Sequence, residues 1–447
     1  MNSERQYIDL YCQCKDVIKA HSAQVMNDVR DKAYEDFVAM GLPDKKVERY
    51  KYTDMQKLFE PDYGLNLKRL DIPVNPYDVF RCDVPNLSTS LYFVVNDSFY
   101  TKAEPKGHLP EGVIVGSLAK VAADCPELVA KYYSRIAKTG DDGVTALNTM
   151  LAQDGLFVYV PANVVVDRAI QVINILRSDV DLMVNRRVLI VLEKGAEAKF
   201  LFCDHAADDR NFLSTQVIEA YVGENASLDL YCLEETHYKS VRVSNVYIEQ
   251  QANSRVNHNV ITLHNGVTRN RLDLVLKGEG AECYANGCVI ADKSQHVDNN
   301  TLIDHQAGHC CSHQLYKYVL GDSAVGAFAG KILVRHGAQK TTSNEINQNL
   351  CTTRQARMFT QPMLEIYADD VKCSHGSTVG QLNDAAMFYM RQRGISEKEA
   401  KLLLEFAFVN EVIDQMKLEP SRERLHYLVE KRFRGELNKC EGCKLCK

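Results

Sequence analysis

The sequence has 447 residues, of which 45% are hydrophobic and 25% charged, the usual balance of a soluble globular protein with two or three domains or one elongated domain. Its net charge of −6 indicates neither nucleic acid nor an anionic membrane as a partner, and no apolar stretch approaches the roughly 18 residues that a membrane span needs. The N-terminal segment lacks the basic and apolar parts of a signal peptide, so the 15 cysteines are expected to be reduced thiols in the cytoplasm.

Residues 1–150 are predicted to form a helical and mixed domain. Apolar side chains recur at helical spacing over residues 22–40, and the pattern stops at Gly41 and Pro43. Residues 124–143 form a second helical pattern that closes this part of the chain.

Residues 151–383 are predicted to form a β-solenoid. From about Gly155, short runs of alternating or β-branched residues follow one another, separated by turns rich in small residues. The turns recur at steps of 28, 30, 27, 28 and 29 residues, with an additional turn at Gly321; they lie at Gly195, Gly223, Asn253, Gly280, Gly308 and Gly337. Even spacing with two strands per step is typical of a solenoid, whereas a propeller needs longer blades. An irregular β-sandwich is the alternative.

Residues 384–447 are predicted to form a helical domain with a cysteine-containing tail. Ser396 and Glu399 are spaced as a capping box, and the apolar positions of the helix that follows cover more than one stripe. This apolar surface is either a docking surface or a layer that packs back onto the solenoid.

The segment ADDVKCSHGSTVGQL, residues 368–382, is a candidate site because Cys373 and His375 lie two residues apart. In a strand the two side chains share one face, about 6–7 Å apart at the Cα atoms. That spacing is awkward for a thiolate–imidazole nucleophile and compatible with two ligands of one metal, and no Gly-rich nucleophile elbow accompanies it. A structural or interface role, a metal or sulfur role and a nucleophile all remain open.

Two other groups of residues could bind iron or zinc. The first is a histidine–cysteine cluster, in which neighbouring Cys310 and Cys311 cannot both join one site; its members are His296, Asp298, Asp304, His305, His309, Cys310, Cys311 and His313. The second is the tail, where Cys440, Cys443 and Cys446 form a C-x-x-C-x-x-C run without a nearby fourth thiolate. The alternatives are a histidine-rich strand pair and a dispensable tail.

Several segments, taken in chain order, are similar to a known family. They are GLPDKKVERYKYTDM, AQDGLFVYVPANVVVDRAI, GEGAECYANG, QHVDNNTLIDH, KILVRHGAQKT, NQNL, LEIYADDVKCSHGSTVGQL and FYMRQRGISEKEA. Over nearly the whole chain these segments resemble SufD, a component of the bacterial Suf iron–sulfur cluster assembly system.

The resemblance implies a right-handed parallel β-helix flanked by helical parts, and a non-enzymatic scaffold subunit. The subunit would pair with a SufB paralogue and dock the SufC ATPase, and a cysteine desulfurase system would supply sulfur for a nascent, transient iron–sulfur cluster. The cluster type, the participation of a flavin and a homodimer of the isolated chain are left open.

The resemblance also implies roles for individual residues. His375 matches a histidine that faces the SufB partner and takes part in cluster assembly, and Cys373 matches the signature cysteine. The ATPase-docking helices fall between about residues 385 and 416; the expected contacts are Phe388, Arg393, Gly394, Ile395, Ala400, Leu404 and Phe406. Two departures favour SufD over SufB. The SufB cysteine would fall at about Asn347, where no cysteine stands, and the nearby Cys351 occupies an apolar strand position; in addition, Cys373-Ser374-His375 replaces an acidic E-H-E.

Two other functions compete with the scaffold. An enzyme could use Cys373 and His375 on a β-helix, as some β-helices act on polysaccharides, although the absence of tryptophan disfavours a carbohydrate groove. A free iron or zinc carrier could use the histidine–cysteine cluster and the tail. No P-loop, dinucleotide-binding glycine motif or H-E-x-x-H sequence supports a common nucleotide or zinc enzyme.

Overall fold

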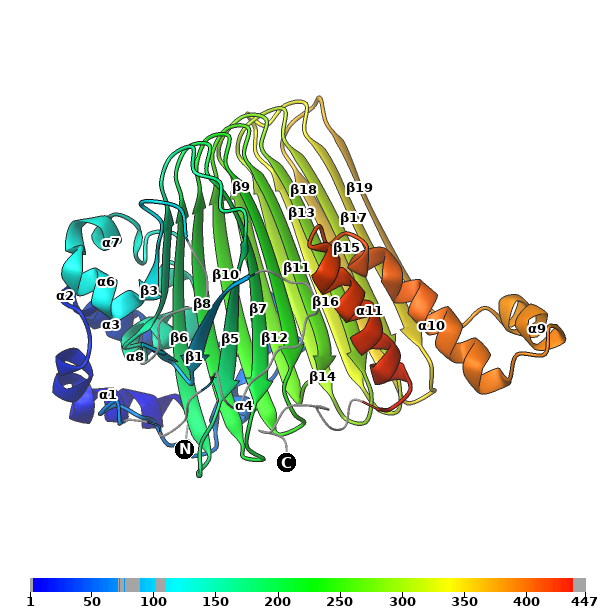
Figure 1. Ribbon diagram of the computed structural model, residues 1–447, viewed down its shortest axis with the longest axis horizontal. Coiled ribbons are helices and arrows are strands. Elements are labelled where there is room, and N and C mark those ends of the chain that lie inside the picture. The colour runs from blue at the N-terminus through cyan, green and yellow to red at the C-terminus, as the bar shows by residue number, and fades with distance from the viewer. Residues whose placement is uncertain (1–2, 71, 73–75, 77–88, 102–108, 437–447) are drawn as a thin grey trace.

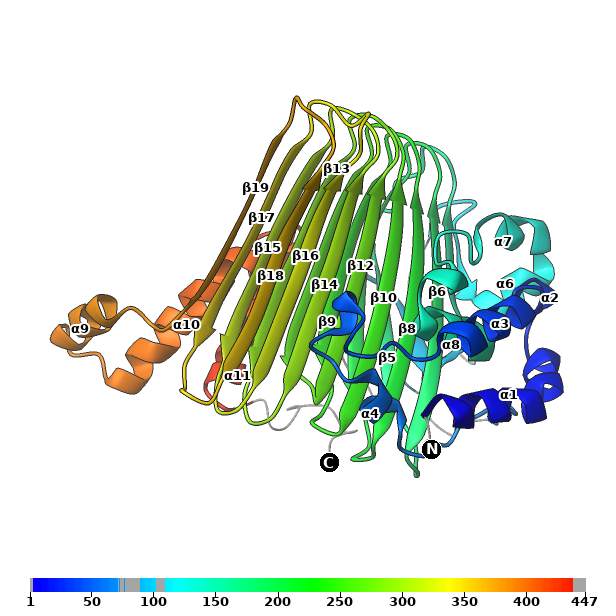
Figure 2. The ribbon, with the colours of Figure 1, turned by 180° about the vertical axis from the view of Figure 1, so that it is seen from behind.

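The chain folds into a two-sheet β-solenoid, seen from one side in Figure 1 and from behind in Figure 2. The computed structural model describes residues 3–70, 72, 76, 89–101 and 109–436. Consecutive strands from β4 onward alternate between the two sheets, so each turn of the chain, here called a rung, adds one strand to each sheet. This topology confirms the predicted solenoid and excludes the irregular sandwich.

From β4 onward, strands that are neighbours within one sheet are two apart in the chain, and they pair in parallel. Sheet B comprises β1 (Thr89–Val95), β2 (Ser98–Phe99), β5 (Ala169–Leu176), β7 (Glu197–Ala206), β9 (Ser227–Glu235), β11 (Arg255–His264), β13 (Glu282–Ala291), β15 (Cys311–Leu320), β17 (Thr342–Cys351) and β19 (Lys372–Gly380). Sheet A comprises β3 (Ile114–Ser117), β4 (Gly155–Val160), β6 (Leu182–Leu192), β8 (Phe212–Val222), β10 (Ser240–Gln250), β12 (Val267–Leu276), β14 (His296–His305), β16 (Val325–Val334) and β18 (Arg357–Ile366).

The register explains the sequence period. Glu197 pairs with Ser227, Ser227 with Arg255, and Arg255 with Glu282, which are steps of 30, 28 and 27 residues. One residue at each corner before the sheet B strands β5 to β17 has a positive φ; these residues are Asn163, Gly195, Asn225, Asn253, Gly280, His309 and Lys340. Glycine and asparagine tolerate that conformation best, which is why small-residue turns marked the repeat. The extra turn at Gly321 lies at the corner before β16.

The space between the sheets is the main core. Side chains alternate along each strand, and one face of every strand points into the solenoid. Most inward residues are apolar, including Phe200, Leu228 and Phe328, each fully buried. A polar seam accompanies them: the Arg186 guanidinium donates to Asp204 at 2.8 Å, and Arg242 forms an ion pair with Asp204 at 2.9 Å.

Helices cover the outer face of each sheet in different places. The N-terminal layer packs on sheet A through Met183, Leu213 and Val243 (Figure 2); it consists of α1 (Ser3–Ala20), α2 (Gln24–Asn27), α3 (Arg30–Met40), η1 (Glu48–Tyr50), α4 (Met55–Phe59), α6 (Leu118–Asp124), α7 (Pro126–Tyr132), η2 (Thr139–Asp141) and α8 (Gly143–Leu151). The expected helix over residues 22–40 is present as α2 and α3, and it ends at Gly41 with a φ of 66°. None of the described helices is long and apolar enough to cross a membrane.

For the C-terminal helices the sequence left two roles open, a layer packed on the solenoid and a free docking surface, and different helices match each of them. The second half of α10 (Glu397–Ile413) and all of α11 (Glu419–Phe433) pack on the outer face of sheet B through Val409, Ile413 and Leu425. By contrast, α9 (Asp384–Gln392) extends away from the solenoid and buries none of its residues (Figure 1). One part is therefore a covering layer, and the other is free surface.

Truncating the buried face of α10 should destabilise the chain more than truncating its exposed face. Ile413 is fully buried, and Ile413→Ala should cost about 2–5 kcal/mol through lost burial and a residual cavity. Leu403 is 38% exposed on the same helix, so Leu403→Ala should cost less than about 1 kcal/mol. Urea unfolding of both variants measures the difference; equal losses would mean that α10 is not packed on sheet B.

Glu234 should make stability fall as the pH rises. Its carboxyl is buried in the polar seam and accepts hydrogen bonds from the Thr268 hydroxyl at 2.7 and 2.8 Å. Burial raises the pKa of Glu234 from 4.5 to about 7, so between these values the folded chain holds a proton that the unfolded chain has lost. The free energy of unfolding then decreases by up to about 3 kcal/mol across this window.

The variant Glu234→Gln should remove that part of the pH dependence, because a neutral amide does not titrate. Urea midpoints measured on both sides of the window give the slope for the wild-type chain and the variant. The exposed Glu423 provides the matched control, Glu423→Gln, which should leave the slope unchanged. An unchanged slope in Glu234→Gln would contradict the shifted pKa.

Candidate functional site

The candidate segment forms β19, which lies at an edge of sheet B. We call β18 and β19 together the terminal rung. Within the described residues β19 pairs only with β17, and β18 pairs only with β16, so each offers one edge of unpaired backbone groups. Burial also decreases here: most residues of β19 are exposed, whereas nearly all of those in β13 are buried. The terminal rung is thus the open end of the solenoid.

Cys373 and His375 share one face of β19, as the sequence predicts, and the structure shows that this face points inward. Cys373 packs against a buried apolar cluster that consists of Ile332, Val334, Ala338 and Ala368. Ser377, two residues after His375, also points inward, since its hydroxyl lies 2.7 Å from that of Thr360 on β18. Inward-pointing side chains therefore lie two residues before and two residues after His375, as expected for a strand. His375 lies between these inward positions and is nevertheless exposed, because none of the described residues forms a further rung over it.

The pair does not have the geometry of a thiolate nucleophile. No hydrogen bond between Cys373 and His375 occurs in the described structure, and the thiol is half-buried among apolar side chains. Burial raises the pKa of the Cys373 thiol, which favours the unreactive protonated form. The arrangement therefore suits an exposed imidazole at an interface better than a self-contained catalytic dyad.

A buried carboxyl lies directly behind His375 and was missed by sequence reasoning. Glu345 of β17 pairs in register with His375 and is fully buried between the sheets. Its Oε2 accepts a hydrogen bond from Gln314 Nε2 at 3.0 Å, and Gln314 Oε1 accepts one from the Thr301 hydroxyl at 2.7 Å. Burial raises the pKa of Glu345 to about 8. The alternation of Ser343, Glu345 and Asn347 was visible in the sequence, but nothing there showed which face is inward.

Near the same end, Asn347 and Cys351 occupy structural positions. Asn347 Nδ2 donates to the Tyr316 carbonyl at 3.2 Å, and its Oδ1 accepts from Thr360 at 2.8 Å. Cys351 ends β17 and packs against the apolar interior, and burial raises the pKa of its thiol.

The histidine–cysteine cluster is not brought together. On β14, His296 and Asp298 point outward to the hydroxyl of Thr53 at 3.0 and 2.6 Å, whereas His305 points inward to Ser312 at 2.9 Å. Asp304 accepts a hydrogen bond from Arg335 at 3.0 Å on the outer face.

The remaining members of that cluster are also separated. His309 occupies a corner with a positive φ, and its neighbour Cys310 donates to the carbonyls of Gly278 and Gly308 at 3.3 and 3.4 Å. Cys311 lies on the outer face of β15, where His313 stacks on Tyr284 at 5.3 Å. Across the part of the chain that the structure describes, no three His, Cys, Asp or Glu side chains are placed to hold a metal. Cys440, Cys443 and Cys446 lie outside the described residues.

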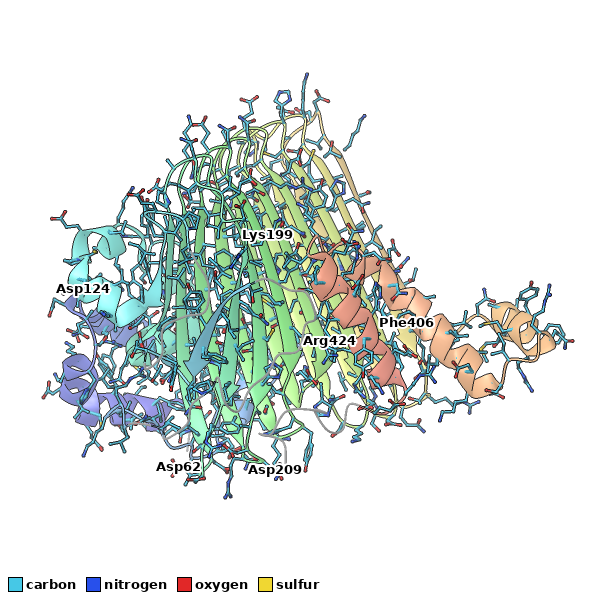
Figure 3. The ribbon with its side chains drawn as sticks, in the orientation of Figure 1. Asp62, Asp124, Lys199, Asp209, Phe406 and Arg424 are labelled. Atoms are coloured by element: carbon cyan, nitrogen blue, oxygen red, sulfur yellow. The ribbon has the colours of Figure 1, made fainter. Side chains whose placement is uncertain are left out.

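The structure separates the residues expected to contact the ATPase. Phe388 on α9 is 65% exposed, and Arg393 and Gly394 are exposed in the turn after it, with Ile395 half-buried. On α10, Ala400 is fully buried and Leu404 is half-buried. Phe406, labelled in Figure 3, packs against His426 of α11 with ring centroids 5.7 Å apart. The free part of this set therefore lies on α9 and the turn that follows.

Comparison with known proteins identifies the family. Residues 1–172 match the SufBD protein N-terminal region, and residues 175–408 match the SufBD core domain of the SUF system for FeS cluster assembly. An iron–sulfur cluster assembly SufBD family protein of Synechocystis is 28% identical over 401 residues, which are 88% of this chain and 87% of the relative.

Two relatives carry the name iron–sulfur cluster assembly protein SufD. The Escherichia coli protein is 35% identical over 173 residues, 39% of this chain and 41% of the relative. The Bacillus subtilis protein is 25% identical over 335 residues, 72% of this chain and 75% of the relative. With more than half of its length matched by the core-domain model, the chain belongs to the SufBD family and is a component of the SUF iron–sulfur cluster assembly system.

Proposed function

We propose that this chain is the SufD-type scaffold subunit of a cluster assembly complex. It pairs with a SufB-type paralogue at the terminal rung and docks a SufC-type ATPase through α9. The nascent iron–sulfur cluster is the cargo, built where the two solenoids meet. The names of the Escherichia coli and Bacillus subtilis relatives support SufD over SufB, as do Cys373-Ser374-His375 and the lack of a cysteine at Asn347.

The observation that carries this proposal is the exposed imidazole of His375 on an unpaired edge strand. Unpaired edges invite pairing with another strand, and natural proteins usually cover or charge them. Here β19 carries the small residues Gly376, Ser377 and Gly380, and a Cβ added at either glycine would meet nothing within 4 Å. This leaves room for a second backbone beside His375.

Docking of the ATPase is supported by the chemistry of α9. Phe388 and Tyr389 are 65% and 60% exposed on a helix that buries none of its residues. Figure 3 shows the side chains of α9 reaching into solvent beyond the solenoid. Two adjacent exposed aromatic rings on a projecting helix are typical of a partner-binding surface.

The scaffold role, rather than catalysis by this chain alone, is supported by the state of Cys373. Its thiol is held in apolar surroundings without a base, so the chain offers no activated nucleophile at this position. An imidazole at an edge can instead contribute one side chain to a site completed by another subunit.

Removing the imidazole should abolish cluster loading without dissociating the complex. In a co-expressed complex with SufB- and SufC-type partners, His375→Ala should retain both partners and lose iron and acid-labile sulfide by roughly tenfold or more. The matched control is His313→Ala, which removes an exposed histidine from the outer face of the same sheet. Normal loading by His375→Ala would show that His375 does not take part in cluster assembly.

Removing the two exposed aromatic rings should release the ATPase. Phe388→Ala combined with Tyr389→Ala should weaken retention of the SufC-type partner by about tenfold or more, since buried aromatic anchors dominate interface energies. The SufB-type partner should remain bound to the variant.

The control for this experiment is Tyr427→Ala on α11, where the ring is 43% exposed on a helix packed against the solenoid. Pull-down through a tag on this chain, with quantification of the ATPase, compares the three proteins. Undiminished retention in the α9 variant would exclude that helix as the docking site.

A further inference from the structure

An inward column of sheet B changes from apolar to polar toward the open end. Its members stack in register across the parallel strands; they are Ile170, Phe200, Leu230, His258, Ala285, Gln314, Glu345 and His375. Neighbouring strands lie about 4.8 Å apart, so consecutive side chains of such a column are within reach of one another. The last three members place an amide, a carboxyl and an imidazole next to one another.

The Glu345 carboxyl is only half-satisfied. Oε2 accepts from Gln314, but Oε1 has no hydrogen-bond partner in the described structure, although the residue is fully buried. An uncompensated buried carboxylate is costly, and a neutral acid with an unused O–H is also unfavourable until it finds an acceptor. Along the column, the neighbour of Glu345 on the side away from Gln314 is His375.

The fold keeps space for this carboxyl. Gly330 faces it from sheet A, and a Cβ built on Gly330 would lie 2.6 Å from Glu345 Oε1. Any larger residue would therefore displace the carboxyl. A glycine without positive φ in the middle of β16 is otherwise unfavourable in a strand, so its small size here has a packing reason.

The two hydrogen bonds that lead to Glu345 are donated in the same direction, toward its carboxyl. The Thr301 hydroxyl donates to Gln314 Oε1, and Gln314 Nε2 donates to Glu345 Oε2. A neutral Glu345 continues the series, because Oε2 is then the accepting oxygen and Oε1–H the next donor. The ring of His375 is exposed and can rotate onto that donor as the partner subunit closes over the terminal rung.

We propose that Glu345 is a positioning residue that donates a hydrogen bond from Oε1 to one ring nitrogen of His375. The second ring nitrogen then carries N–H and is presented outward as a donor to an anionic sulfur, a sulfide or thiolate, of the growing cluster. This inference rests on the proposed role of His375 and specifies it: His375 recognises sulfur as a hydrogen-bond donor.

The test compares two substitutions of similar size. Glu345→Gln reproduces the neutral acid, with the amide oxygen accepting from Gln314 and Nε2 donating to His375. Glu345→Met removes both polar atoms and should be at least as stable as the wild-type chain, because an unsatisfied carboxyl is replaced by an apolar side chain. Gly330→Ala displaces the carboxyl without changing Glu345, and it serves as the independent variant if Glu345→Met does not fold.

The first readout is the tautomer of the His375 imidazole in the full-length chain with its partners, taken from ring 15N chemical shifts and assigned by the signal lost in His375→Ala. The wild-type chain and Glu345→Gln should show a single tautomer, and Glu345→Met and Gly330→Ala a mixture. The second readout is iron and sulfide content: Glu345→Gln should stay within about twofold of wild type, and Glu345→Met should fall by roughly tenfold.

The outcomes test whether Glu345 positions His375 and whether it does so as a neutral donor. An unchanged tautomer and normal loading in Glu345→Met would overturn the positioning role. Equal losses in Glu345→Gln and Glu345→Met would overturn the neutral-donor form, since a charged carboxylate would then be required. If His375→Ala itself loads normally, the proposed function fails, while the tautomer readout still decides whether Glu345 orients His375.

Discussion

Parallel pairing between successive rungs is the constraint on which the structure depends. In sheet B from β5 onward, each rung takes 27 to 31 residues to return to the same register position, for example 27 from Arg255 to Glu282 and 31 from Cys311 to Thr342. Side chains at equivalent positions therefore stack into columns through the interior. A residue's environment is set by its neighbours one rung before and one rung after, so the chemistry of the molecule is organised along these columns.

The terminal rung is paired on one side only. Cys373, His375 and Ser377 have a preceding rung beneath them, and no following rung among the described residues. Inward side chains that would be core elsewhere become surface here, and two strand edges lack partners. A site at the terminal rung receives side chains from the preceding rung only and needs a second chain to supply the rest. This is consistent with an assembly protein whose function depends on a partner.

The sequence allowed the solenoid to be predicted because the corners need residues that accept a positive φ. At Gly195, Asn253 and Gly280 the residue with the positive φ itself marked the repeat. At the two later corners the positive φ belongs to His309 and Lys340, and only the neighbouring glycines marked the turn, so that the corner histidine resembled part of a metal cluster. That Cys373 and His375 share one strand face followed from alternation alone. Glu345 could not be found in the same way, because its importance depends on the register of β17 with β19 and on the space that Gly330 leaves. The sequence also could not show which C-terminal helices pack on the solenoid and which remain free. Phe388 and Phe406 are both phenylalanines, yet the first is exposed and the second is half-buried.

The central claim is that the free edge of β19 is completed by a partner chain. Hydrogen–deuterium exchange of residues 372–380 tests it directly, in the isolated chain and in the complex with a SufB-type partner. The account predicts that the amides on the unpaired edge of this strand exchange rapidly in the isolated chain and are strongly protected in the complex. The amides of β13 should be protected in both states. Equal exchange of residues 372–380 in the two states would contradict it.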